Sequence, residues 1–501
     1  MKRLVREAQA LSLSEIITVR RKGMRVSEYF ELGRTQSELD FVDIDIDGDV
    51  PVFVDPRALR LLETEWGGLC VHLIQDCFTE IITELGANHV QRAQGILRTL
   101  KEPNETHLGL SKRKAQGRAL GNESSVDVSD SLLSSVAVRT GLLEDLEDTI
   151  LLVDGIGPDI ISDMTTNIIR GPLITYTQDM CNLYGIPLQE VGSGPIWDET
   201  KKEFTTIHVL QPVANNKKLL FVPKSIVRVR MDYNPDEYYR DYLLQHLRGI
   251  ELGTPSSELV TLLKNGEKRV FSKDLVKKYG QGKKAALRIT IEHPDVLDRY
   301  RNSKSSFTRR TLDNAELAEA IGVELPNLDV LLHDVLRVPP GTENATLFHR
   351  NVEKLISALF SPDLAYPQIE RPIHDGRKRI DITYTNVAAS GFFKWIGDHA
   401  PAPYVFLECK NYSRDLANPE LDQIAGRFSP RRGKFGIIVC RNIEEKQAFL
   451  RKCKDTLLDD RGIVLPLDDN DLALLVEQTK DPANLPGVYP LLKTRCDEIM
   501  L

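Results

Sequence analysis

The stretch YVFLECKNYS, residues 404–413, decides how the C-terminal region of this chain can fold. Its first four residues are typical of a buried β-strand, and a carboxylate and an ammonium group follow two positions apart. Successive side chains of a strand point to opposite faces, so Glu408 and Lys410 share one face while Leu407 and Cys409 share the other. An unpaired charge at the end of an apolar strand is costly, so this pattern predicts a partner for both charges on their common face.

The residues on either side of this strand predict a mixed sheet between helices. A run of helix breakers at 337–341 precedes a helix over 342–360 that has one apolar stripe. Apolar runs bounded by turn residues predict strands over 368–374, 379–386, 404–412, 435–440 and 462–468, and helices over 419–428 and 444–460. This order of elements favours an α/β domain in which helices flank one mixed sheet.

A second acidic residue lies on the neighbouring predicted strand. Asp381 stands between Ile380 and Ile382, so the two isoleucines face the core and Asp381 faces away from it. If that strand pairs with the opening stretch, Asp381, Glu408 and Lys410 converge on one side. Two close carboxylates repel unless a divalent cation lies between them, and Mg²⁺ accepts carboxylates, waters and phosphate oxygens as ligands. Lys410 would then orient or deprotonate an attacking water, or offset charge on the phosphorus.

The string Glu-x-Lys is a weak signal alone, because it also occurs at 199–201 and 444–446 without an apolar strand before it. At 408–410 the strand, an upstream aspartate and a downstream helix coincide. In these features the chain resembles the PD-(D/E)xK, or restriction-endonuclease-like, nucleases, in particular the Mrr-like branch of type IV restriction and phage-defence systems. The resemblance covers residues 342–470, within the C-terminal third of the chain, and it rests on the segments RIDI, ECKNYS, QIAGR and FGIIVCR.

The resemblance implies a role for each matching position. Asp381 and Glu408, with the backbone carbonyl of Cys409, would bind Mg²⁺, for which Mn²⁺ can substitute. Lys410 would be the catalytic lysine. Gln423, on the following helix, would help to position water or phosphate.

Further positions complete or depart from the family pattern. Glu353, on the helix that opens the domain, stands where some of these nucleases place an additional metal-binding carboxylate. Ile380 replaces the proline of the family's name, and the segment 387–403 before the strand of Glu408 is long. The aromatic residues of this segment could stack on bases or pack hydrophobically, and packing is the stronger expectation.

Each of these residues also has a purely structural interpretation. Glu408 and Lys410 could form a surface ion pair at a strand edge, worth less than about 1 kcal/mol. Gln423 and Arg427 lie one helical turn apart and could simply be exposed. The side chain of Cys409 is expected in the core, because strand alternation turns it away from Glu408.

Basic residues in two places are candidates for contact with nucleic acid. Residues 264–310 hold 14 Lys and Arg against 5 Asp and Glu, a local charge of +9 in a chain whose net charge is −8. Segregated charge of this kind is typical of a surface that follows phosphates, and a solvated basic face explains it equally well. The residues we expect to contact DNA are Lys277, Lys278, Lys283, Lys284, Arg427, Arg431, Arg432 and Lys434.

The length of 501 residues is too great for one ordinary core, so several domains are expected. We divide the chain into an N-terminal mixed α/β region with a sensor or regulatory role (1–255), a basic segment (256–338) and the nuclease domain (339–501). In the first region, two apolar segments flank Asp47-Gly48 and predict a β-hairpin over 38–56.

The cysteines and the hydropathy pattern bear on the cellular compartment. Seven scattered cysteines without C-x-x-C spacing indicate a reducing cytosol rather than a disulfide framework or a zinc ribbon. No apolar run approaches the roughly 18 residues needed to cross a bilayer. We therefore expect a cytoplasmic protein without membrane partners.

Taken together, these patterns predict a metal-dependent DNA endonuclease whose catalytic domain is C-terminal. The resemblance places it in restriction or anti-phage defence, where a partner ATPase or another defence subunit could take part. Cutting both strands at one position would need two such domains, which favours a homo-oligomer. The alternatives are a nuclease-fold protein that binds DNA without cutting it, and a nuclease that acts on RNA or on special DNA structures.

Overall fold

The structure is a computed structural model that describes residues 23–109, 142–306, 311–373, 378–481, 483–484 and 486–501, together with Leu132, Ser135 and Ala137. It has a mixed α/β architecture with two large hydrophobic cores. The first core draws on residues from Val26 to Ile321, and the second on residues from Leu331 to Ile499. Within the described residues, no helix combines the length and the apolar character needed to span a membrane.

The second core is built on a five-stranded mixed sheet, which confirms the mixed sheet that the sequence predicts. Its strand order is β11-β12-β13-β14-β15, with antiparallel pairing from β11 to β13 and parallel pairing from β13 to β15. The strands are β11 (Leu364–Ile373), β12 (Lys378–Asn386), β13 (Tyr404–Lys410), β14 (Phe435–Cys440) and β15 (Ile463–Leu467). All six residues of β14 are buried, as expected for a strand covered on both faces.

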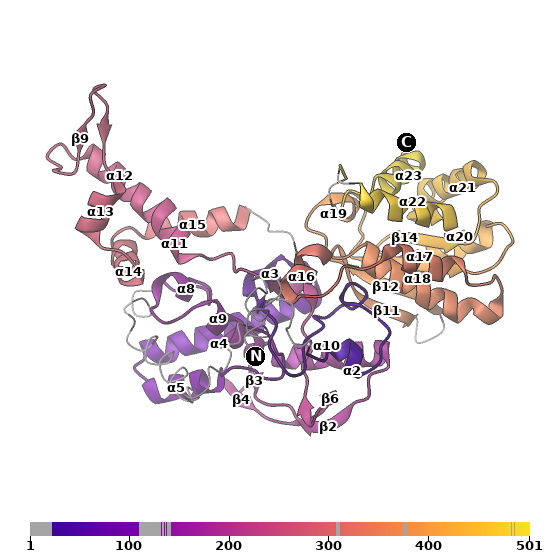
Figure 1. The fold of residues 1–501 in the computed structure, drawn as a ribbon, viewed down its shortest axis with the longest axis horizontal. Coiled ribbons are helices and arrows are strands. Elements are labelled where there is room, and N and C mark those ends of the chain that lie inside the picture. Colours follow the sequence, from indigo (N-terminus) through magenta and orange to yellow (C-terminus); the bar gives the residue numbers. More distant parts are fainter. Residues whose placement is uncertain are drawn as a thin grey trace, which may run out of the picture.

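Helices cover this sheet on both faces (Figure 1). They are α17 (Leu328–Leu336), the short η4 (Thr342–Asn344), α18 (Ala345–Leu359), α19 (Gly391–His399), α20 (Asn418–Ala425), α21 (Lys446–Leu458), α22 (Asp469–Lys480) and α23 (Pro490–Met500). A Cβ added to Gly436 would lie 2.7 Å from Cδ1 of Ile424, so glycine at this position of β14 allows α20 to pack closely. Helix α19 lies in the long segment 387–403, and its Phe392 and Phe393 are buried, in line with the expectation that the aromatic residues of this segment pack hydrophobically.

The N-terminal body is rich in helices and contains only short strands. Its elements are α2 (Val26–Tyr29), η1 (Gln36–Glu38), β1 (Phe53–Val54), α3 (Pro56–Leu61), α4 (Glu65–Gly86), α5 (Val90–Thr99), α8 (Asp148–Leu152), α9 (Pro158–Ile168), α10 (Arg170–Tyr184), β2 (Gln189–Gly192), β3 (Ile196–Asp198), β4 (Glu203–Thr205), β5 (His208–Gln211), β6 (Val213–Ala214), β7 (Lys217–Lys218), η2 (Lys224–Ile226) and β8 (Val227–Arg228). Their strands pair only two at a time.

The predicted hairpin over 38–56 is wrong, although the chain does turn at Asp47-Gly48. Strand β1 pairs with β8, and the backbone N–H of Val42 donates to the carbonyl of Val222. The two apolar segments therefore lie against a distant part of the chain rather than against each other. Their burial explains this, because Phe41, Val42 and Ile44 are all enclosed and a solvent-facing hairpin would expose one side.

The basic segment continues an arm of the molecule that begins before it. The arm comprises α11 (Pro235–Glu237), the π-helical turn η3 (Tyr238–Leu243), α12 (Leu244–Gly253), β9 (Thr261–Leu262), β10 (Lys268–Arg269), α13 (Ser272–Tyr279), α14 (Lys283–Glu292) and α15 (Pro294–Ser306), and α16 (Asn314–Ile321) follows it. Figure 1 shows α12, α13 and β9 extending away from the other elements. Apolar residues of the arm, such as Leu275 and Ile289, belong to the first core.

Charged and aromatic contacts join the N-terminal body to the sheet domain. The guanidinium group of Arg34 forms two hydrogen bonds with the carboxylate of Glu353 on α18, and the closer pair of atoms is 2.6 Å apart. Asp40 Oδ1 accepts a hydrogen bond of 2.8 Å from the backbone N–H of Tyr366 on β11, and Oδ2 accepts one of 2.7 Å from the hydroxyl of Tyr176 on α10. The two cores are therefore in direct contact beside α18 and β11.

Candidate active site at the end of β13

Glu408, Lys410 and Gln423 form one hydrogen-bonded cluster at the carboxyl end of β13. Lys410 Nζ lies 2.8 Å from Glu408 Oε1 and 2.9 Å from Gln423 Oε1, and the side-chain amide of Gln423 donates to the same Glu408 oxygen. Strand alternation puts both charges on the face that α20 covers, and α20 supplies the glutamine. The structure therefore brings together these three residues that the sequence selects.

The carboxylate of Glu408 is deeply buried, with 1% of the side chain exposed. Burial and the nearby charge of Asp381 raise its pKa, and Lys410 opposes this effect. Among the described residues, its Oε2 atom has no hydrogen-bond partner. A buried anionic oxygen without a partner is costly, so it is available to a cation or to a donor on a ligand.

Asp381 acts electrostatically on Glu408, but its carboxylate lies beside His349 and the thiol of Cys409, which strand alternation places on the face of β13 opposite Glu408 and Lys410. The predicted convergence on one face is therefore not what the structure shows, and the hydrogen bond that Asp381 accepts comes from the backbone. The register between β12 and β13 ends at the pair Ile382–Leu407, and beyond it Asp381 Oδ2 accepts a hydrogen bond of 2.9 Å from the N–H of Cys409. Opposite this point on β11, Glu370 has a φ of +51°, which interrupts a regular strand. At the end of β13, the carboxylate of Asp381 thus replaces a backbone carbonyl as the acceptor for the N–H of Cys409.

The immediate neighbours of the Asp381 carboxylate are His349 and the thiol of Cys409. One ligand atom from each of the three lies within 4.8 Å of the other two, and His349 Nε2 is 3.8 Å from Asp381 Oδ2. Burial and the charges of Asp381 and Glu408 raise the pKa of the Cys409 thiol. His349 was not among the residues predicted from the sequence, although it lies one helical turn before Glu353 on the same face of α18.

Glu353 lies in a different setting from the other predicted site residues. It is fully buried at the contact between the two cores, where it binds Arg34 and accepts a hydrogen bond of 3.0 Å from Ser357. Both of its carboxylate oxygens are therefore occupied by partners within the protein. The structure places His349, rather than Glu353, beside Asp381.

The predicted DNA-contacting residues of the sheet domain differ in their availability. Arg427 lies close enough to Glu408 to lower the pKa of that carboxyl against the effect of burial, and its Nε atom is buried. Arg431 is exposed. Arg432 donates to the carbonyl of Arg427 at 3.1 Å, and Lys434 forms an ion pair of 2.9 Å with Asp460.

The predicted DNA-contacting lysines of the arm also separate into two groups. Lys283 donates to the backbone carbonyls of Val153 and Ile156, so it anchors α14 to the N-terminal body. Lys277 and Lys284 are exposed. Lys278 is half exposed and lies 2.6 Å from Glu251 Oε1. Exposed cations therefore remain along α13 and at the start of α14.

A cleft of about 570 Å³ opens between the N-terminal body and the sheet domain. Residues of α10, including Tyr176 and Asp179, form one wall, and His349 and Arg350 of α18 and the irregular part of β11 form the other. His349 also lies 3.8 Å from Asp381, so this wall of the cleft adjoins the Asp381 carboxylate.

The oxygen donors at the end of β13 are of the type that suits a hard divalent cation. Carboxylate and carbonyl oxygens are the protein ligands that Mg²⁺ prefers. Glu408 offers a buried oxygen that has no hydrogen-bond partner in the described part of the chain, and the charge of Asp381 acts on the same carboxyl. Asp381, Glu408 and the carbonyl of Cys409 therefore offer the donor types of a magnesium site, whereas the ligand atoms found within 4.8 Å of the Asp381 carboxylate belong to His349 and Cys409.

Comparison with known proteins assigns only the N-terminal body. Residues 31–234 match the model of a family described as a domain of unknown function, DUF8370. The match includes α10 and Arg34 and ends before α11, so it leaves the arm and the sheet domain outside it. No curated protein and no solved structure gives a significant match to the chain.

Proposed function

We propose that this protein is a metal-dependent DNA endonuclease and that its sheet domain has the restriction-endonuclease-like fold. The observation that carries the proposal is the cluster of Glu408, Lys410 and Gln423 beside Asp381, at the end of a central strand. A buried carboxylate, a lysine that it holds in place and a neighbouring second carboxylate are the groups that hydrolysis of a phosphodiester requires. Apart from α19, the elements from α18 to β14 follow the order predicted from the sequence for the region that resembles the family.

Each residue of the cluster has a distinct task in this proposal. Asp381, Glu408 and the carbonyl of Cys409 would hold Mg²⁺, and a bound Mg²⁺ supplies charge neutralisation at the phosphate and a more acidic water. Lys410 places a positive charge beside the scissile phosphate and orients the attacking water. Gln423 holds Lys410 in position through a hydrogen bond of 2.9 Å.

The other regions would bring DNA to this site and control access to it. The exposed lysines of α13 and α14 provide a phosphate-binding surface on the arm. The cleft places α10, within the DUF8370 match, opposite His349 of α18, so target recognition by the N-terminal body would act beside Asp381. Restriction or anti-phage defence is the setting that the family resemblance suggests, and it rests on that resemblance alone.

The direct test is cleavage of plasmid DNA by the purified full chain in Mg²⁺ or Mn²⁺. Wild type is expected to cut, and Lys410→Met is expected to bind DNA in a gel-shift assay without cutting it. Lys201→Ala is a matched control, because Lys201 belongs to the same Glu-x-Lys string but is 60% exposed and far from the sheet. Circular dichroism and thermal melting of Lys410→Met separate loss of chemistry from loss of fold, since this change leaves Glu408 without its cation.

A non-cutting DNA-binding protein is the second candidate function. The observation that favours it is the hydrogen bond of Asp381 to the Cys409 backbone, which directs this carboxylate away from Lys410. In that case wild type and Lys410→Met would bind DNA equally and neither would cut in any metal. Parallel reactions with single-stranded DNA, branched DNA and RNA distinguish a nuclease with another substrate, which Lys410→Met would also inactivate.

A further inference from the structure

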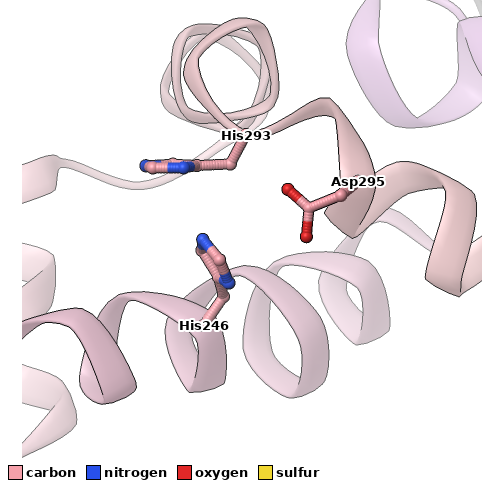
Figure 2. A group of neighbouring side chains, drawn as sticks. All are labelled: His246, His293 and Asp295. Carbon is pink, nitrogen blue, oxygen red and sulfur yellow. The ribbon is translucent and has the colours of Figure 1, made fainter.

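A cluster of two histidines and one aspartate lies in the arm, apart from the candidate active site. His246 comes from α12, whereas His293 and Asp295 flank the junction between α14 and α15 (Figure 2). Pro294 explains the junction, because a residue before proline is disfavoured in a helix and proline suits the first helical position. Helix α14 therefore ends at Glu292, and α15 begins at Pro294 in a new direction.

The three side chains are close enough to share one ion. One ligand atom from each lies within 4.8 Å of the other two. The two imidazole rings have centroids 4.6 Å apart and are inclined at 61°, and Figure 2 shows the ring of His246 rising from α12 toward the ring of His293. Asp295 completes the group from the first turn of α15.

His246 has an unsatisfied ring nitrogen. Its Nδ1 lies 3.0 Å from Arg299 Nη2, and arginine can only donate, so Nδ1 is the acceptor. The neutral ring then carries its proton on Nε2, which is buried and has no hydrogen-bond partner in the part of the chain that the structure describes. A metal ion that binds Nε2 removes the conflict, because the ring proton then lies on Nδ1 and Arg299 is displaced into solvent.

Arg299 also shows that the donors of this cluster attract positive charge. Its guanidinium group lies beside His246 and 3.4 Å from Asp295 Oδ2. The Arg299 side chain is 55% exposed, so it can turn into solvent at little cost when an ion binds. A cation therefore already stands beside two of the three donors.

We propose that His246, His293 and Asp295 bind one divalent transition-metal ion, with Zn²⁺ as the representative of this class. Two imidazole nitrogens and one carboxylate suit zinc and its neighbours, whereas Mg²⁺ prefers oxygen donors. The ion ties α12 to the α14–α15 junction and so fixes these helices of the arm relative to one another. Three protein ligands leave a fourth position open to water or to a ligand atom. This inference does not depend on the proposed nuclease activity.

Titration of the full chain with Zn²⁺ or Co²⁺ tests the proposal. The titration is made in the His349→Ala background, because His349, Asp381 and Cys409 form the other cluster of possible ligands among the described residues. One equivalent of Co²⁺ is expected to give the visible absorption of a four- or five-coordinate site. Zn²⁺ is expected to displace it and to raise the melting temperature further, and Mg²⁺ in excess is expected not to displace it.

Single substitutions then assign the ligands. His246→Ala and His293→Ala are each expected to weaken binding by about 100-fold or more, and Asp295→Asn by about 10-fold or more. Arg299→Ala is expected to tighten binding by about two- to fivefold, because it removes the competing cation. His72→Ala is the control for nonspecific binding by an exposed histidine, and it should change nothing.

The Arg299→Ala result separates a real site from simple packing of two rings. A folded protein that binds no equivalent of Co²⁺ or Zn²⁺, with or without Arg299, would overturn the proposal. Binding that survives both histidine substitutions and is lost in His72→Ala would overturn it as well.

Discussion

The candidate active site at the end of β13 and the cluster of His246, His293 and Asp295 in the arm are two candidate metal sites that are built differently. The site at the end of β13 offers oxygen donors and a lysine from neighbouring strands of a buried sheet. The cluster in the arm offers two imidazoles and one exposed carboxylate, which come from α12 and from the α14–α15 junction. Oxygen donors favour Mg²⁺ and imidazoles favour transition metals. The two sites should therefore differ in the metal ion that they bind as well as in the mutations that affect them.

The largest difference between the two sites is expected from Glu408→Gln, which should affect cleavage but not metal binding by the arm. The change keeps the shape of the side chain and removes the charge that Lys410 and a cation would share. We expect the single-turnover rate of plasmid cleavage in Mg²⁺ to fall by about 10³-fold, while binding of Co²⁺ by the arm stays as in wild type. Glu444→Gln, in another Glu-x-Lys string, is the control. Cleavage by Glu408→Gln at the wild-type rate would remove Glu408 from the site.

The next largest effect is expected on stability, at the contact between the two cores. Arg34→Ala leaves the fully buried carboxylate of Glu353 without its partner, so the free energy of unfolding should fall by about 3 kcal/mol in urea denaturation. Adding Glu353→Gln should recover part of this loss, because the uncompensated charge disappears. Arg379→Ala breaks an exposed pair with Glu370 and should cost less than about 1 kcal/mol. Equal losses in Arg34→Ala and Arg379→Ala would contradict this account of the contact.

A smaller effect on cleavage is expected from Gln423→Ala. Gln423 contacts Lys410 and Glu408 but holds no charge, so it acts by positioning them. We expect the cleavage rate to fall by about 10- to 100-fold, with the affinity for DNA unchanged. Arg461→Ala is the control. Arg461 is exposed and pairs with Asp422, which lies on the same helix as Gln423, and this variant should cut DNA normally. A Gln423→Ala variant as inactive as Glu408→Gln would make the glutamine a direct participant instead.

The smallest effect is expected from Asp163→Asn in the N-terminal body. Burial, and then the negative charges of Glu102, Asp159 and Asp49, raise the pKa of Asp163 to about 8. The folded state therefore keeps a proton that the unfolded state loses above about pH 4, and stability falls as the pH rises from there to about 8. Asp163→Asn should stabilise the protein by about 1 kcal/mol or more at pH 8 and by much less at pH 5. A gain in melting temperature that does not depend on pH would contradict the assignment.

The sheet domain was predictable from the sequence because its signals are local. Each of its strands is a short apolar run between breakers, and β13 carries its charges only at its end. The N-terminal body gave weaker signals, because its strands are two to four residues long and find distant partners. Phe53 pairs with Arg228, and no local pattern around Phe53 announces that partner.

Within the candidate site, residues joined by one element or one turn were easier to predict than residues joined by packing. The shared face of Glu408 and Lys410 follows from strand alternation, and the helix after β13 brings Gln423 to them. The direction of Asp381 depends on the end of a strand ladder and on the backbone of Glu370 in another strand. His349 and Glu353 share one face of α18, so the choice between them depends on where α18 lies along its axis against the sheet, which sequence periodicity does not specify.

The central claim is that Asp381 acts together with Glu408 and Lys410 on one phosphodiester. The most direct measurement is the Mg²⁺-dependent cleavage rate of Asp381→Asn beside wild type, with circular dichroism to verify folding. We predict a folded variant that retains DNA binding and has lost cleavage. A folded Asp381→Asn variant that cuts at the wild-type rate would contradict the claim.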